Sequence, residues 1–120
     1  MTRSATVLVV DDDAAVREIS ACMLEELGYV VLQAESGPDA LARIEDAPEL
    51  DIMVTDIRMP GMSGLELSDI ATRRRRDLGV VLVSGYFLPQ PLSHRFVQKP
   101  FRTHELDAAI RAELSHRTHA

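Results

Sequence analysis

The sequence lacks the features that would place this protein in a membrane or outside the cell. No apolar stretch approaches the roughly 18 residues that a membrane-spanning helix needs. Residues 1–4 lead directly into an apolar run and leave no room for the apolar segment of a signal peptide. The single cysteine, Cys22, cannot form an internal disulfide. We therefore expect a cytoplasmic protein with no membrane contact.

Positive charge is also scarce. The chain has 13 Lys and Arg residues against 19 Asp and Glu residues, and its net charge is −6. Nucleic-acid phosphates select for clustered positive charge, so this balance argues against a nucleic-acid-binding surface. The exception is the run Arg73-Arg74-Arg75-Arg76. We interpret it as a solvated helix end, where cations interact favourably with the helix dipole, and a partner-docking patch is the alternative.

The remaining composition is typical of one soluble domain spanning residues 1–120, with 46% apolar and 27% charged residues and no repeat or linker. Short apolar runs alternate with helical patterns, and such runs suit strands buried on both faces of a parallel sheet. Repeated strand–helix–strand units favour a doubly wound α/β fold. The predicted strands are Thr6–Val10, Val30–Ala34, Ile52–Thr55, Val80–Ser84 and Arg95–Gln98.

Each predicted helix follows a residue that can cap its first turn. The second is expected over Gly37–Asp46, and the last carries Leu106, Ile110 and Leu114 on one face. The predicted caps are Asp13, Ser36, Ser63 and Thr103, with Glu66 completing a capping box and Gly28 ending the first helix.

The interval between Ser84 and Lys99 breaks this rhythm. Pro89 and Pro91 prevent a regular helix through its middle, because proline lacks the backbone donor and restricts the residue before it. We expect at most about one helical turn there.

Polar residues follow four of the predicted strands, at the edge where doubly wound sheets bind ligands. They are Asp11 and Asp12, Asp56, Ser84 and Lys99, the only lysine in the chain. Adjacent carboxylates repel each other unless a cation compensates them, and Mg²⁺ prefers such hard oxygen ligands. We interpret Asp13 as a helix cap and the pair before it as metal-binding. Asp56 is the candidate phosphoryl acceptor, with Lys99 supplying positive charge and Ser84 a hydrogen bond.

At these residues the chain resembles the response-regulator receiver domains of bacterial two-component signalling. The matching segments are VLVVDDD (7–13), DIMVTDIRMPGMSGLEL (51–67), VVLVSGY (80–86) and QKPF (98–101). The resemblance implies a flavodoxin-like five-stranded parallel sheet in the order 2-1-3-4-5, with helices on both faces.

The resemblance also implies a role for each site residue. Asp56 would accept a phosphoryl group from a phosphohistidine of a sensor histidine kinase or phosphotransfer protein. Mg²⁺ would be held by Asp12, Asp56 and the backbone carbonyl of Arg58, with Asp11 acting through water. The phosphoryl-sensing residues would be Ser84 and Lys99, and Phe96 stands at the position of the aromatic switch.

Three departures from the family pattern are informative. Phe96 has no hydroxyl, so any inward swing of its ring would be driven by packing. Gly85 replaces the alanine often found after the hydroxyl residue and would leave a phosphoryl group more exposed. The Ser84–Lys99 interval is shorter than usual by about two helical turns, ~7 residues. We therefore expect the fourth helix, between the fourth and fifth strands, to be shortened or missing, as in receivers of hybrid kinases or their stand-alone relatives.

Our leading hypothesis is a single-domain receiver that acts through partner proteins, as a switch or phosphate shuttle and possible homodimer, and not as an enzyme. A second is an interaction module that keeps the fold but signals without phosphorylation. A third is a phosphatase or phosphotransferase, which would need an acid two residues after Asp56, where Arg58 stands. The four histidines, at 94, 104, 116 and 119, have spacings poor for a phosphodonor or a metal site, and we interpret them as solvated.

Overall fold

The computed structural model describes residues 4–86 and 93–118. Strands and helices alternate through most of this part of the chain, as predicted. In chain order they are β1 (Thr6–Val10), α1 (Ala14–Glu26), β2 (Val30–Ala34), α2 (Gly37–Asp46), β3 (Ile52–Asp56), α3 (Gly64–Arg74), β4 (Gly79–Ser84), β5 (Arg95–Gln98) and α4 (Thr103–Thr118). None of the helices within the described ranges is long and apolar enough to span a membrane.

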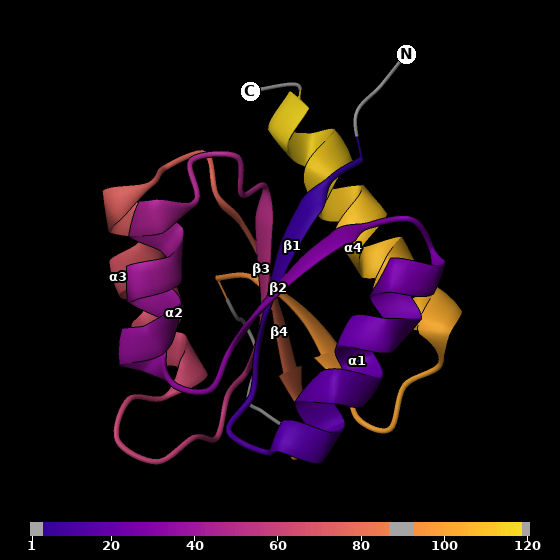
Figure 1. The fold of residues 1–120 in the computed structure, drawn as a ribbon, viewed down its shortest axis with the longest axis horizontal. Coiled ribbons are helices and arrows are strands. Elements are labelled where there is room, and N and C mark those ends of the chain that lie inside the picture. The colour runs from indigo at the N-terminus through magenta and orange to yellow at the C-terminus, as the bar shows by residue number, and fades with distance from the viewer. Residues whose placement is uncertain (1–3, 87–92, 119–120) are drawn as a thin grey trace.

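The five strands form one sheet in the order β2-β1-β3-β4-β5, and every neighbouring pair is parallel. Helices α2 and α3 cover one face, and α1 and α4 cover the other (Figure 1). The predicted fold class and strand order are confirmed. In this order β1 and β3 are adjacent in the middle of the sheet, so the loops that follow them emerge side by side.

Successive residues of the central strands point to opposite faces, and each face has its own core. Leu8 and Val10 pack with Met53 under α2 and α3, whereas Val7 and Val9 belong to the core under α1 and α4. All five residues of β1 are buried. Burial on both faces is why the strand sequences are continuous apolar runs rather than alternating ones.

Most helix ends form as the sequence predicts. Asp13 accepts hydrogen bonds from the backbone N–H groups of Ala15 and Val16, and Ser63 and Glu66 form a reciprocal capping box. Gly28, which ends α1, has a φ of 97°, where a side chain would be strained.

Three boundaries differ from the prediction, and one of them is the start of β4, at Gly79 rather than Val80. Helix α4 begins at Thr103, because the N–H of Leu106 bonds to the carbonyl of Arg102 and the Glu105 carboxylate accepts the Arg102 N–H at 2.7 Å. Arg102 therefore takes the capping position expected for Thr103. Strand β3 extends by one residue to include Asp56, which pairs with Val83 of β4.

The interval between β4 and β5 is described only at its ends. Residues 85, 86, 93 and 94 are not helical. Residues 87–92 lie outside the described residues. Because Pro89 and Pro91 are among them, the predicted effect of these prolines falls outside the described part of the chain. The four helices of the described ranges include none between β4 and β5.

Candidate functional site

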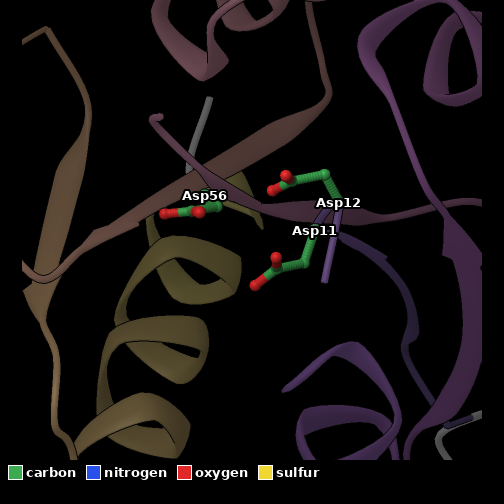
Figure 2. Close-up of side chains that lie close together, drawn as sticks. All are labelled: Asp11, Asp12 and Asp56. Carbon is green, nitrogen blue, oxygen red and sulfur yellow. The ribbon is translucent and has the colours of Figure 1, made fainter. Parts of the chain in front are cut away.

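Three carboxylates meet at the edge formed by the carboxyl ends of β1 and β3. Asp11 and Asp12 follow β1, and Asp56 ends β3. One oxygen from each carboxylate lies within 4.8 Å of the others. Figure 2 shows the three side chains around a common space. The pairing of β1 with β3, in which Val10 lies opposite Thr55, brings them together from positions far apart in the sequence.

Asp56 is held in place by backbone contacts. Its Oδ1 accepts the N–H of Ile57 at 3.0 Å. The first residue of α3, Gly64, packs so closely that a Cβ there would collide with the backbone carbonyl of Asp56. The N–H of Gly64 also donates to the carbonyl of Ile57 at 2.8 Å. A side chain at position 64 would therefore displace the loop that carries Arg58.

The ammonium of Lys99 lies between two of the acids. Its Nζ is 3.2 Å from Asp11 Oδ2 and 3.8 Å from Asp56 Oδ1. The backbone N–H of Lys99 donates to the carbonyl of Ser84 at 2.8 Å, so the β4–β5 pairing sets the lysine's position. One ammonium faces three carboxylates, and the site keeps an excess of negative charge.

The pKa of the Asp56 carboxyl is raised from its ordinary value. Burial is the largest cause, and the charges of Asp11 and Asp12 add to the rise. Lys99 and the N–H of Ile57 oppose it. A hard divalent cation would offset the repulsion among these acids, and Mg²⁺ favours carboxylate oxygens of this kind. The donor set therefore fits the magnesium ion that the sequence predicts.

Ser84 ends β4, next to Asp56 in the sheet, and is buried. Its Oγ accepts the N–H of Tyr86 at 3.1 Å. Phe96 lies one strand further away, opposite Leu82, and its half-buried ring packs against the core under α2 and α3. The structure thus gathers the three acids and Lys99, places Ser84 on the adjoining strand end, and leaves Phe96 packed in the sheet.

Two arginine side-chain contacts near the site were not predicted from the sequence. The guanidinium of Arg17 donates to the backbone carbonyl of Asp11 at 2.8 Å. The guanidinium of Arg58 lies over the ring of Tyr86, 4.2 Å from its centre, and joins the loops that follow β3 and β4. Exposed arginines on helices and loops are common, so only their three-dimensional partners distinguish these two.

The family model of the response regulator receiver domain matches residues 7–111. Sensor kinase CckA of Brucella abortus (strain 2308) is 35% identical over 95% of this chain and 13% of its own length. The transcriptional regulatory protein FixJ of Azorhizobium caulinodans is 39% identical over 95% of this chain and 57% of its own length. Response regulator receiver protein CpdR of Brucella abortus is 30% identical over 83% of this chain and 88% of its own length. The chain therefore spans a minor part of the kinase but most of CpdR.

Solved structures agree in fold. The receiver domain of hybrid histidine kinase CckA superposes with a TM-score of 0.81 at 31% identity, covering 92% of this chain and 99% of that one. Response regulator TrrA of Thermotoga maritima, in complex with Mg(2+)-BeF, superposes with a TM-score of 0.84 at 32% identity and the same coverage. These matches, with the acidic site at the strand ends, show that the chain belongs to the response regulator receiver domain family, whose members receive signals in two-component phosphorelays.

Proposed function

We propose that Asp56 accepts a phosphoryl group, with Mg²⁺ bound, from a phosphohistidine of a sensor histidine kinase or phosphotransfer protein. The modified chain then acts on a partner protein as a switch or phosphate shuttle. The observation that carries this proposal is the meeting of three carboxylates within 4.8 Å of one another, with Lys99 beside two of them.

The transfer forms one bond and breaks another. An oxygen of the Asp56 carboxylate bonds to phosphorus as the P–N bond of the donor breaks, and the bonding electron pair stays on the imidazole nitrogen. A magnesium ion held by Asp12, Asp56 and the carbonyl of Arg58, with Asp11 acting through water, would neutralise the transferring oxygens. Because such reactions depend mainly on positioning and charge, Lys99 serves by placing its ammonium beside the acceptor.

The modification of Asp56 would change the contacts of three residues, Ser84, Lys99 and Phe96. The Ser84 hydroxyl accepts a hydrogen bond from Tyr86 and can still donate its own hydrogen to a phosphoryl oxygen. Lys99 would exchange its contact with Asp11 for one with the new dianion. Phe96 has no hydroxyl that could form a hydrogen bond with Ser84. A rearrangement of its ring would therefore be driven by its packing against the core.

The phosphodonor must reach Asp56, so it has to contact the surface around the site. An apolar groove of about 520 Å³ lies there, between α1 and the loop that follows β5. Its lining includes Ile19, Met23 and Phe101, and it shares Lys99 with the site. Ile19 is 61% exposed. We propose that the histidine-bearing protein docks on this groove. In a solved structure, the histidine kinase ThkA forms a complex with TrrA, the response regulator described above.

We further propose that the chain does not turn over other substrates. Phosphatases and phosphotransferases that use an aspartyl-phosphate commonly need a second acid two residues after the nucleophile. That position is Arg58, whose side chain lies over Tyr86.

The test is labelling by acetyl phosphate in the presence of Mg²⁺, measured as a mass increase of one phosphoryl group. We expect Asp56→Asn to abolish labelling, because an amide oxygen is a poor nucleophile. Asp13→Asn is the matched control: it lies in the same acidic run but caps α1, and asparagine caps equally well. Labelling of the Asp56 variant at the wild-type level would show that the acceptor is another residue.

A further inference from the structure

Arg17 connects two neighbouring strands at the edge of the acidic site. Its Nη1 donates to the backbone carbonyl of Asp11 at 2.8 Å, and its Nε donates to Oε1 of Gln33 on β2 at 3.1 Å. Both donors belong to one planar guanidinium, which holds its hydrogen bonds in a fixed fork. The backbone of Arg17 is itself anchored, since its N–H donates to the carbonyl of Asp13 at 2.9 Å.

The carbonyl that Arg17 holds belongs to the peptide unit between Asp11 and Asp12. A peptide unit is planar, so fixing its oxygen fixes the direction in which the next residue leaves it. The bond from Arg17 therefore sets the orientation of both acids, although it touches only a backbone atom.

The two acids depend on this peptide unit to different extents. The Asp11 side chain has its own anchors: Oδ1 accepts the Asp13 N–H at 2.9 Å, and Oδ2 contacts Lys99. The carboxylate of Asp12 is exposed, and among the described residues it makes no hydrogen bond or ion pair. Its position is set by the backbone alone.

We propose that Arg17 is a positioning residue, which aims the carboxylate of Asp12 at the metal position by holding the Asp11–Asp12 peptide unit. This inference rests on the proposed magnesium site. Groups that orient metal ligands from behind commonly change metal affinity by about 10–100-fold when they are mutated. Both groups that accept hydrogen bonds from Arg17, a carbonyl and an amide, are neutral. The guanidinium could therefore also act on the acids through its charge, and the effect of charge has to be separated from the effect of position.

Arg17→Lys and Arg17→Gln separate position from charge. Lysine keeps the positive charge but has no planar fork to hold two acceptors at once, and glutamine removes the charge as well. Arg43→Gln is the matched control. Arg43 lines a small polar pocket together with Arg17, Gln33 and Asp39. It pairs with Asp39 rather than with the Asp11 backbone. Urea unfolding of each variant ensures that all measurements are made on folded protein.

Two measurements decide the proposal. By calorimetric titration, both Arg17 variants should raise the Mg²⁺ dissociation constant by about tenfold, with no change in the Arg43 variant. In metal-free protein, NMR relaxation should show the order parameter of the Asp12 amide falling from about 0.85 toward 0.6 in both Arg17 variants.

The proposal is overturned if Arg17→Lys restores wild-type affinity, because charge would then be sufficient. It is also overturned if the Asp12 amide stays as rigid as in wild type. Failure of the wild-type protein to bind Mg²⁺ would instead contradict the proposed function. The metal-free NMR measurement would still decide whether Arg17 positions Asp12.

Discussion

At the scale of single residues, the carboxylate of Asp56, the proposed phosphoryl acceptor, is ionised in an unfavourable environment when no cation is bound. Burial is the largest cause that raises the pKa of Asp56, the charges of Asp11 and Asp12 add to the rise, and Lys99 opposes it. Burial disfavours the charged form of a carboxyl group, and a rise of one pKa unit corresponds to about 1.4 kcal/mol. Because Lys99 opposes the burial and the two acids, the net penalty on ionised Asp56 is of order 1 kcal/mol.

Asp56→Asn should therefore stabilise the metal-free protein at neutral pH. The pKa of Asp56 is raised in the folded state, so its contribution to stability is fully present below the unfolded value, about 3.9, and is lost as the pH rises through the folded value. We expect the variant to exceed wild type by about 1 kcal/mol at pH 7 and by nothing below about pH 4. The measurement is urea unfolding at several pH values, with a chelator present.

Saturating Mg²⁺ provides the control for this prediction. The ion should stabilise the wild type strongly and the variant weakly, because Asp56 is a proposed ligand. If the variant is less stable than wild type at neutral pH without metal, the ionised Asp56 carboxylate does not destabilise the folded protein, and the prediction is wrong.

At the scale of elements, one arginine of the run 73–76 joins two helices and a strand. Arg75 directly follows α3 as its C-cap residue, and its guanidinium donates to the carbonyls of Ala47 at 2.9 Å, Pro48 at 3.2 Å and Leu50 at 2.7 Å. These carbonyls lie where α2 ends and the chain turns toward β3, a place where backbone acceptors have no helical partner. A run that we interpreted as a solvated helix end thus contains a structural contact.

Arg75→Ala should cost about 2 kcal/mol of unfolding free energy, because it removes several hydrogen bonds from a charged donor and leaves carbonyls poorly satisfied. Arg76→Ala is the matched control, since Arg76 is exposed and should change stability by less than about 0.5 kcal/mol. The measurement is urea unfolding. Equal losses in the two variants would show that Arg75 contributes only its charge.

At the scale of the whole molecule, the groove and the exposed apolar residue Val30 lie at opposite ends of the strands. The groove is lined by α1, by Gly85 after β4 and by residues 99–101 after β5, so it lies at the carboxyl ends of the strands. Val30, which is 51% exposed, is the first residue of β2 and lies at the amino ends of these parallel strands. A partner that approaches Asp56 through the groove would therefore bind away from Val30.

Ile19→Glu should therefore separate the two kinds of phosphodonor. We expect phosphotransfer from a cognate histidine kinase to slow by about tenfold, the effect of losing roughly 1.4 kcal/mol of binding. Labelling by acetyl phosphate should be unchanged, because a small donor needs no docking surface. Val30→Glu is the control and should leave both rates as they are. Equal slowing with the two donors would mean that Ile19 supports the site rather than the partner.

The fold class could be predicted from local patterns because the chain is locally consistent. Continuous apolar strands, capped helices and their alternation all favour a doubly wound sheet, and acids after β1 and β3 must then meet at one edge. The family resemblance supplied the strand order. The exceptions were small: Arg102 rather than Thr103 caps α4, because the carboxylate of Glu105 reaches back to it.

The sequence by itself determined which residues could carry the chemistry, namely the acids, Lys99 and Ser84, because strand ends are readable from short apolar runs. Only the tertiary structure decided which arginines support the site and the fold. Arg17 of α1 bonds to Gln33 of β2 near the site, and Arg75 bonds to Ala47, away from the site, at a separation of 28 residues. An arginine on a helix is usually solvated, and local sequence does not show which distant carbonyl its guanidinium will meet.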